Sequence, residues 1–488
     1  MLTTTIIFSI FLSYSCLTIY QQSHYCKKEY YIYFLKNIIY YNLIPLVLFI
    51  IIYFTKGIIF YFLIIILWLY SLSFIFFRIK LKFTPRIIRL IFIYLIYFFI
   101  LSLVPYINIL LFQFINLLSL PALLIDSMIS KKINKKYINI AKTKLDNYKN
   151  EVIGITGSFG KSSVKKIYYD VLSEYTNVVI PPKSFNTPLG IASFLEKTNL
   201  NLYSKLILEY GVSKKNDMDE LLRLKKPNVA VITEIGPMHL KNFKTIDNIL
   251  KEKMKIIKDA NIIIANFENE YLRNYNYENK IVLSYGFNYG RYKAINITNN
   301  SFDLYDNDKF IIKIEFKLNG THQILNTLAV LSYLLFFNYD INIAKNKLLL
   351  IEGEKNRLEV KKTKNGVILD DSYNSNPLGF KNALALLKNQ KGKKVLLTPG
   401  IVELGHLKKD IHKKLIPYIV DSCDCIILIG ILEQLYLYQE LKNYNKEVYL
   451  VRNFNEGMKI YKKITKNICS SLLIENDVTD IYLRRLIF

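Results

Sequence analysis

The stretch Glu151–Tyr175, EVIGITGSFGKSSVKKIYYDVLSEY, decides the fold of the chain. Its first six residues are mostly apolar and β-branched, which predicts a buried strand over Glu151–Thr156. A glycine turn follows, and apolar residues then recur at helical spacing from Val164 onward. The stretch therefore predicts a strand, a glycine-rich turn and a helix in succession.

This turn has the chemistry of a polyphosphate site. Backbone N–H groups and a helix N-terminus favour an anion, Lys161 adds charge, and a hydroxyl such as that of Ser162 can hold Mg²⁺. The strict phosphate-loop spacing is missed, because Ile155 stands where the first glycine is expected. A plain strand-to-helix connection is the alternative, and it is disfavoured by the lysine directly after Gly160.

The composition narrows the classes of partner. The 488 residues carry a net charge of +26, from 65 Lys and Arg against 39 Asp and Glu. These basic residues form no single dense arm, which favours phosphate substrates and a membrane surface over nucleic acid. The cysteines form no C-x-x-C pair, so we expect them to be reduced, buried and inert. They are Cys16, Cys26, Cys423, Cys425 and Cys469.

The first 130 residues are far more apolar than the rest and predict a membrane region with about five helical spans. The first span lacks a cleavage site and predicts an uncleaved helix. The fourth is short, and the last pair could instead form a re-entrant hairpin. The predicted spans are Leu2–Tyr20, Ile38–Thr55, Gly57–Phe77, Leu90–Val104 and Ile107–Ile125.

Basic residues in the short loops predict the orientation of this region. Five alternating spans place three basic clusters on one side, which is then the cytoplasmic side. The clusters are Lys27, Lys28 and Lys36; Arg78, Lys80, Lys82, Arg86 and Arg89; and Lys131, Lys132, Lys135 and Lys136. We therefore expect a multi-pass protein of the cell membrane, in contact with lipid, with everything after residue 130 in the cytoplasm, where ATP is available.

After a basic connector over residues 131–150, apolar strand-like runs alternate with helical patterns, which predicts α/β domains with mostly parallel sheets. We expect a central domain over 151–350 and a C-terminal domain over 351–488, joined by a hinge at 353–356. The predicted central strands include 205–208, 229–233 and 262–265, and the C-terminal ones are 367–369, 394–397, 425–429, 447–451 and 471–474.

Eight short motifs in order give the chain from Glu151 to Phe488 a resemblance to the Mur ligase family. They are TGSFGKSS, FNTPLG, LEYG, ITEIGPMHL, KEKMKI, NGTHQILNTLAV, GEKNRLEV and DDSYNSNP, beginning at residues 156, 185, 208, 232, 251, 319, 353 and 370. The resemblance implies a phosphate-loop ATP-binding domain followed by a Rossmann-like domain. It also implies that ATP converts a carboxylate of a cell-wall precursor into an acyl phosphate, which an amine then attacks.

The resemblance assigns roles to individual residues. Lys161 would hold the β- and γ-phosphates, Ser162 and Glu209 one Mg²⁺, and His239 a second, supported by a carbamylated Lys253. Asn326 would recognise adenine, and Arg357 and Asp371 would reach the nucleotide from the C-terminal domain. The remaining nucleotide residues would be Thr156, Gly157, Ser158, Gly160 and Ser163, and the substrate residues Asn186, Thr187, Tyr373, Asn374 and Asn376.

Each polar residue also has an ordinary structural interpretation. Glu209 could be a helix cap or surface charge, and His239 an exposed turn histidine. Lys253 is one of four lysines between positions 251 and 258, a pattern typical of a solvated helix face. Asp370 and Asp371 are more specific, because adjacent carboxylates at a strand end repel and favour a cation.

Three departures from the family leave the substrate open. The soluble domain that grips a uridine nucleotide is replaced by the apolar region, Glu234 stands where an asparagine is usual, and acidic residues occupy 475–480 in place of a KGS-type segment. Such an acidic cluster suits an amine or a metal better than a carboxylate.

The default amine is D-alanyl-D-alanine, and a ligase acting on a lipid-linked precursor with a different amine is the alternative. A transporter is disfavoured, because Asp126 is the one acidic residue near the ends of the predicted spans. An inactive nucleotide-binding scaffold is disfavoured by the complete set of site residues.

Overall fold

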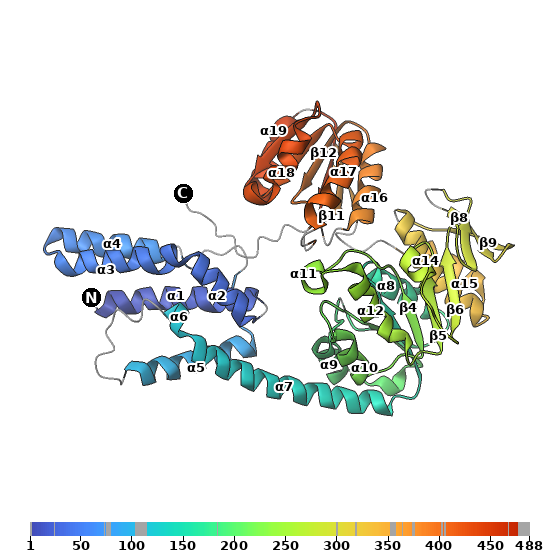
Figure 1. The fold of residues 1–488 in the computed structure, drawn as a ribbon, viewed down its shortest axis with the longest axis horizontal. Coiled ribbons are helices and arrows are strands. Elements are labelled where there is room, and N and C mark those ends of the chain that lie inside the picture. The colour runs from blue at the N-terminus through green and yellow to red at the C-terminus, as the bar shows by residue number, and fades with distance from the viewer. Residues whose placement is uncertain are drawn as a thin grey trace. The chain divides into compact units, whose positions relative to one another are not determined.

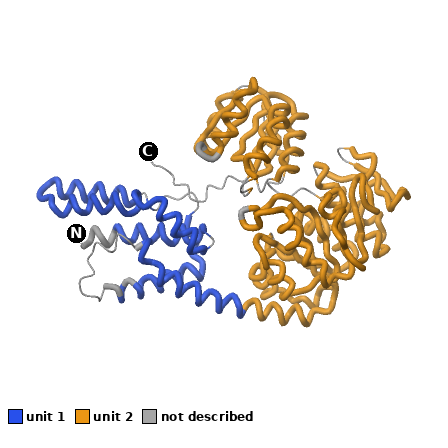
Figure 2. The backbone as a smooth tube through the Cα atoms, viewed as in Figure 1, with its two compact units in different colours: residues 1–136, 479–488 blue, residues 137–478 orange. Residues whose placement is uncertain are grey.

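The computed structural model describes residues 2–23, 25–72, 74, 80–102, 115–182, 184–298, 301–317, 320–351, 358–363, 365–372, 376–401, 404, 407–466 and 468–476. The chain forms two compact units, which Figure 2 distinguishes by colour. Unit 1 comprises residues 1–136 and 479–488, and unit 2 comprises residues 137–478.

Unit 1 is helical throughout its described part (Figure 1). Its helices share one apolar core, in which Phe8, Tyr30, Phe49, Leu67 and Leu90 are fully buried. The helices are α1 (Leu2–Gln22), α2 (Lys27–Lys36), a short π-helix (Ile39–Leu43), α3 (Ile44–Phe54), α4 (Ile58–Leu72), α5 (Pro85–Ser102), α6 (Ile115–Leu118) and the first part of α7 (Leu120–Asn147).

Among the described residues, no single helix of unit 1 has both the length and the apolar character needed to cross a membrane. The pair Lys27–Lys36 and Ile39–Phe54 reaches that length together, with a bend of 70° between them, and Ile58–Leu72 is a shorter apolar helix. Parts of the third, fourth and fifth predicted spans lie outside the described residues. The five spans remain a prediction.

Helix α7 differs from the sequence-based expectation. We predicted a span that ends at Ile125 and a separate basic connector from Lys131. Instead one helix of 28 residues runs from Leu120 to Asn147. Its last turns, from Tyr137 onward, belong to unit 2, where Ala141 and Leu145 are buried among apolar side chains.

The first sheet of unit 2 has the strand order β2-β3-β1-β4-β5-β6-β7-β8-β9 among the described residues. Strands β1 to β6 pair in parallel, β7 pairs in parallel with β6, and β8 and β9 extend the sheet through antiparallel pairs β7–β8 and β8–β9. The strands are β1 (Glu151–Thr156), β2 (Val178–Val179), β3 (Lys205–Glu209), β4 (Val229–Ile232), β5 (Ile262–Asn266), β6 (Ile281–Gly286), β7 (Tyr292–Ile295), β8 (Ser301–Asp306) and β9 (Lys309–Glu315).

Helices cover both faces of this sheet and bury its alternate residues. Helices α8, α14 and α15 lie in one apolar cluster, and α9, α10 and α12 lie in the other. The bounds are α8 (Lys161–Leu172), α9 (Pro188–Glu196), α10 (Asp217–Leu224), α11 (Leu240–Phe243), α12 (Ile246–Met254), α13 (Glu270–Arg273), α14 (Thr321–Phe336) and α15 (Ile341–Leu348). Two 3₁₀ turns are Leu200–Leu202 and Lys255–Ile257.

The second sheet has the order β10-β11-β15-β12-β13-β14 and is parallel except for β10. Its strands are β10 (Glu359–Thr363), β11 (Gly366–Asp371), β12 (Lys393–Thr398), β13 (Cys425–Ile429), β14 (Glu447–Val451) and β15 (Ser470–Glu475). Its helices are α16 (Pro377–Lys388), α17 (Lys408–Ser422), α18 (Ile431–Leu441) and α19 (Phe454–Ile464).

The structure confirms the strand–turn–helix of 151–175 and each predicted strand of both sheets. It adds the antiparallel β10, whose polar sequence carries no strand pattern, and the hairpins β7–β9. The predicted hinge 353–356 lies outside the described residues. The cysteines are free, as expected, but Cys26 and Cys469 are exposed, so the expectation of burial is wrong for these two.

Candidate active site

The glycine turn 157–160 leaves no room for a side chain at either of its glycines. Gly157 has a φ of 149° and Gly160 a φ of 80°. A Cβ on Gly157 would lie 2.0 Å from Thr233 Oγ1, and a Cβ on Gly160 would lie 2.7 Å from Asn326 Oδ1. Two glycines are therefore required to form this cradle of backbone at the N-terminus of α8.

The turn is also tied to the loop that follows β4. The Ser158 N–H donates to the Glu234 carbonyl at 2.6 Å, and the Ser158 hydroxyl donates to the Gly236 carbonyl at 3.0 Å. The hydroxyl of Ser158, a residue predicted to contact the nucleotide, thus stabilises the turn. Its neighbour Thr156 donates from its hydroxyl to the Tyr210 carbonyl at 3.1 Å and fixes β1 in the same way.

Lys161 begins helix α8 and folds back over the turn. Its ammonium donates to the carbonyls of Gly157 at 2.8 Å and Ser158 at 3.2 Å. The charge therefore sits beside the helix N-terminus, where both the helix dipole and the ammonium favour a phosphate group.

Glu209 lies at the carboxyl end of β3 and is 1% exposed. One carboxylate oxygen accepts from the Ser162 hydroxyl at 2.9 Å, and the other accepts from the Asn186 amide at 2.9 Å. The structure brings together three residues that the sequence analysis placed in the site. Burial in such a network argues against the alternative of a surface charge.

A fourth member of this cluster, Lys165, was missed by the sequence analysis. It is 3% exposed, and its ammonium lies 3.5 Å from Glu209 Oε2 and donates to the Pro181 carbonyl at 3.1 Å. Lys165 follows Ser162 by three residues, so both lie on one face of α8. This three-residue spacing is the feature of the sequence that places Lys165 beside Ser162.

The Ser162 and Glu209 oxygens fit a magnesium ion. Mg²⁺ in nucleotide sites is held by one or two carboxylate or hydroxyl oxygens together with substrate phosphates. Among the described residues, no group of three or more His, Cys, Asp or Glu is placed to hold a metal by itself. A magnesium ion here would therefore depend on phosphate oxygens for its other ligands.

Lys253 lies in α12 with its side chain inside the site and is 1% exposed. Its ammonium donates to the Gly157 carbonyl at 2.9 Å, the same carbonyl that Lys161 contacts. Burial lowers the pKa of Lys253 well below its usual value, and the nearby charge of Lys161 lowers it further. The solvated-face interpretation is therefore wrong for Lys253, although Lys251 on the same helix is exposed.

His239 precedes α11 in a left-handed conformation, with a φ of 53°. It is partly buried in the loop after β4. Its assignment to a second metal with Lys253 stays a prediction.

A pocket opens beside the glycine turn and is lined by residues of both α/β parts of unit 2. Gly160, Ser163 of α8 and Asn326 of α14 come from the part built on the first sheet. Asp371 of β11 and Asn376 at the start of α16 come from the part built on the second sheet. Asn326 donates to the Gln323 side chain at 3.0 Å, which fixes its amide within α14. Residues predicted to bind the nucleotide from both domains thus line one cavity.

Glu234, the unusual carboxylate of this chain, also lines that pocket. It accepts hydrogen bonds from the side chains of Asn266 and Asn269, both at 3.2 Å. Burial raises the pKa of the Glu234 carboxyl, against the opposing effect of the Asn269 hydrogen bond.

The adjacent carboxylates Asp370 and Asp371 do not act as the predicted pair. Successive strand residues point to opposite faces, and Asp370 is bound by Lys361 at 2.6 Å. Burial raises the pKa of Asp370, but the hydrogen bonds from Lys361 and Ser372 outweigh it, and the pKa lies below its usual value. Asp371 instead accepts from the Leu358 N–H at 3.0 Å.

Two predicted substrate residues are helix caps. Thr187 accepts from the Gly190 N–H at 3.2 Å at the start of α9, and Asn376 accepts from the Gly379 N–H at 2.9 Å at the start of α16. Arg357, Tyr373 and Asn374 lie outside the described residues.

Comparison with known families covers most of unit 2. The Mur ligase middle domain matches residues 155–334, and the Mur ligase glutamate ligase domain matches residues 356–469. No Mur domain match covers the N-terminal region.

Curated relatives include the UDP-N-acetylmuramoyl-tripeptide–D-alanyl-D-alanine ligase of Bacillus subtilis, 29% identical over 69% of this chain and 74% of that protein. The enzyme of the same name from Borreliella burgdorferi is 32% identical over 57% of this chain and 62% of that protein.

Solved structures share the fold. MurF from Acinetobacter baumannii aligns with a TM-score of 0.63 at 21% identity, over 70% of this chain and 77% of that one. The MurF ligase of Thermotoga maritima in complex with ADP aligns with a TM-score of 0.62 at 24% identity, over 71% and 81%. The two matched domains, the glycine cradle and these relatives lead to one conclusion: the chain belongs to the Mur ligase family and is an ATP-dependent acid–amino-acid ligase.

Proposed function

We propose that this ligase adds D-alanyl-D-alanine to the peptide carboxylate of a muramoyl-tripeptide precursor of the cell wall. The observation that carries the proposal is the buried cluster beside the glycine turn, where Ser162 and Glu209 oxygens lie 2.9 Å apart next to Lys161. The curated relatives named above carry this activity in their names.

The reaction has two steps. A carboxylate oxygen of the precursor attacks the γ-phosphorus of ATP, the bond to the β-phosphate oxygen breaks, and ADP leaves. The ammonium group of the second substrate loses one proton, and its nitrogen attacks the acyl carbon. Phosphate leaves with the former carboxylate oxygen, and the nitrogen loses a second proton as the amide forms. Lys161 and the backbone N–H groups of the turn stabilise the charge on the transferring phosphoryl group.

Ser162 and Glu209 would hold Mg²⁺, which supplies charge neutralisation at the β- and γ-phosphates. Asn186 and Lys165 keep the Glu209 carboxylate oriented toward this position. Burial lowers the pKa of Lys253 and so favours the neutral amine, the form that reacts with carbon dioxide to give a carbamate. The resulting carboxylate would join His239 at a second metal.

A second candidate acceptor is a lipid-linked precursor with a different amine. Two observations favour it: the family match begins at residue 155, and Glu475 ends β15 in register with Asp371. Glu475 is fully buried, and a carboxylate at this strand end suits an amine better than a peptide carboxylate. In either case we propose that unit 2 works in the cytoplasm, where ATP is available.

Incubation of the purified chain with ATP, Mg²⁺ and the uridine-linked tripeptide tests the proposal. We expect a pentapeptide product with D-alanyl-D-alanine and none with L-alanyl-L-alanine, read by mass spectrometry. No product with any amine would overturn the proposal. In depleted cells, accumulation of a lipid-extracted precursor in place of a soluble one would identify the second candidate.

A further inference from the structure

Unit 1 exposes far more apolar surface than a helical bundle in water tolerates. Single helices of this bundle are apolar on their outer faces as well as in the core they share. Exposed side chains, from 43% to 89% of their surface, include Val47, Ile51, Tyr53 and Phe54 on α3, Ile58, Ile59, Tyr61, Phe62, Ile65 and Leu69 on α4, and Phe92, Leu95, Ile96, Phe99 and Ile100 on α5.

Helices α5 and α7 each carry their basic residues in one part of their length and exposed apolar residues in another. Helix α5 carries Arg86 and Arg89 in its first two turns and only uncharged residues from Leu90 to Ser102. Helix α7 runs in the opposite sense, with exposed Leu124 and Met128 before its lysines at 131, 132, 135 and 136. Each helix therefore has an apolar segment and a basic segment.

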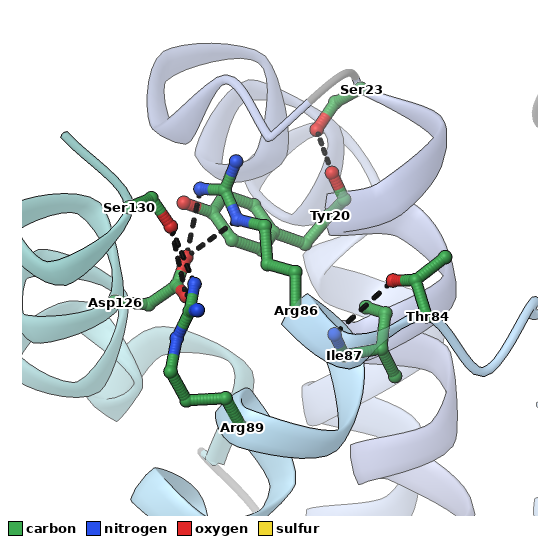
Figure 3. A network of polar contacts seen from close by, with 8 residues as sticks. All are labelled: Tyr20, Ser23, Thr84, Arg86, Ile87, Arg89, Asp126 and Ser130. Carbon is green, nitrogen blue, oxygen red and sulfur yellow. Dashed lines mark hydrogen bonds and ion pairs between the residues drawn. The ribbon is translucent and has the colours of Figure 1, made fainter. Parts of the chain in front are cut away.

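A buried carboxylate of α7 binds the two arginines in the basic segment of α5 (Figure 3). Asp126 of α7 is fully buried and accepts from Arg86 at 2.8 and 3.0 Å and from Arg89 at 2.9 Å. Arg89 also donates to the Ser130 hydroxyl at 2.6 Å. Two arginines on one carboxylate leave the cluster positively charged, and the two arginine side chains are about a quarter exposed, at 27% and 26%.

The end of α1 and the residues just before α2 contact Arg86 and the segment that precedes α5. The Arg86 guanidinium lies 3.8 Å from the centre of the Tyr25 ring. Tyr25 precedes Lys27 by two residues and Lys28 by three. Gln21, near the end of α1, exchanges two hydrogen bonds with the backbone of Lys82. Arg86 and Arg89 thus lie at Asp126, and further basic residues stand close in sequence to the residues that contact this pair of arginines and the chain before α5. The exposed apolar residues of α5 follow Arg89 along the helix.

We propose that unit 1 docks into an anionic lipid bilayer. Its exposed apolar segments would lie in the hydrocarbon, and the arginines at Asp126 and the lysines of α7 would lie at the lipid phosphates. Residues 1–136 contain 13 Lys and Arg but only two acidic residues, Glu29 and Asp126. Anionic phosphates complement this charge, whereas a second copy of unit 1 would bring a like charge to the same surface. The inference does not depend on which substrate unit 2 uses.

Vesicle flotation of the purified full chain tests the docking. We expect the chain to float with vesicles of phosphatidylcholine and to partition more strongly into vesicles that are half phosphatidylglycerol, with the difference lost at high salt. Failure to float with either vesicle would overturn the proposal.

Two pairs of variants locate the surface. Replacing exposed Lys131 and Lys132 by Ala should lower partition into anionic vesicles on the order of tenfold, because each basic residue near the surface contributes to binding. The matched control replaces Lys462 and Lys463 of α19, which are also exposed, and should leave partition unchanged. Phe92→Asp with Leu95→Asp should weaken binding to both vesicles, and Leu202→Asp in unit 2 should not.

Two outcomes contradict the proposal. Equal partition of the Phe92/Leu95 variant and the unaltered chain would remove α5 from the lipid surface. Self-association without vesicles that the same variant abolishes would assign the surface to a second copy of the chain. Melting temperatures show whether each variant remains folded, which we expect because every altered side chain is exposed.

Discussion

At the scale of single residues, the environment of Lys253 separates it from the lysines beside it. Lys253 is buried against the Gly157 carbonyl, whereas Lys255 forms ion pairs with Asp219 at 2.6 Å and Glu252 at 2.8 Å. Two ammonium groups, of Lys161 and Lys253, share one carbonyl, which is unfavourable unless one of them is neutral. A carbamate on Lys253 would replace this repulsion by attraction.

Lys253→Ala should therefore lose ligase activity on the order of a hundredfold, the usual loss when one charge-stabilising group is removed. Acetate or another short carboxylate should restore part of it, since the missing group is a carboxylate. Lys251→Ala is the matched control and should be nearly neutral, because its side chain is exposed. Equal losses in both variants, or no rescue by a carboxylate, would remove the carbamate from the account.

At the scale of elements, the glycine turn joins β1 to α8 with a geometry that other residues cannot reproduce. Gly160→Ala should weaken ADP binding and lower the melting temperature for two reasons: a left-handed φ of 80° and a contact of 2.7 Å with Asn326. The backbone cost alone is about 1–2 kcal/mol. Gly57→Ala has a similar φ of 68° but open space around it, so it measures the backbone cost alone. If the two variants lose equal stability, the close packing of the turn contributes nothing.

Helix α17 holds the loop after β12 through a neutral histidine. His412 is 2% exposed, and its Nε2 accepts from the Ile401 N–H at 2.8 Å. Burial, with a smaller contribution from the charge of Lys408, lowers the pKa of His412 from 6.5 to about 4. Between those two pH values the unfolded chain binds a proton that the folded chain refuses, so stability falls as the pH drops below 6.5 and is complete above it.

The predicted size of this effect is about 2 kcal/mol between pH 7 and pH 5. Urea unfolding of the full chain at both pH values measures it. His412→Gln should lower stability at pH 7 because the contact with Ile401 changes, but it should flatten the difference between the two pH values. An unchanged pH dependence in the variant would assign the acid sensitivity to other groups.

The spacing of apolar residues, glycines and β-branched runs predicts the parts of the fold that depend on neighbouring residues, but not the contacts between distant segments. The strand, turn and helix of 151–172 follow from apolar spacing and glycine, and the later strands from β-branched runs. The contact of Glu209 with Asn186 depends on the loop after β2, which brings Asn186 to the end of β3, and no local sequence pattern predicts it. Likewise β10 carries Lys361 and Lys362 and is a strand only because β11 lies beside it.

At the scale of the whole molecule, a Mur ligase catalytic part is joined to an N-terminal helical unit that no Mur domain match covers. The family explains the order of motifs from residue 156 onward and the cavity shared by the two sheets. It does not explain unit 1, whose exposed apolar helices and excess of 13 basic over two acidic residues need a separate partner. The continuous helix α7 connects the two parts without a break between 120 and 147.

In the reaction that we propose, ATP activates a carboxylate of the acceptor as an acyl phosphate. Transfer of oxygen-18 tests it most directly, with an acceptor whose reacting carboxylate is labelled in both oxygens. We expect one labelled oxygen in each phosphate released, in step with amide formation. The Lys161→Ala variant should release little phosphate, because it lacks the ammonium that faces the turn. Product formation with unlabelled phosphate would contradict the account.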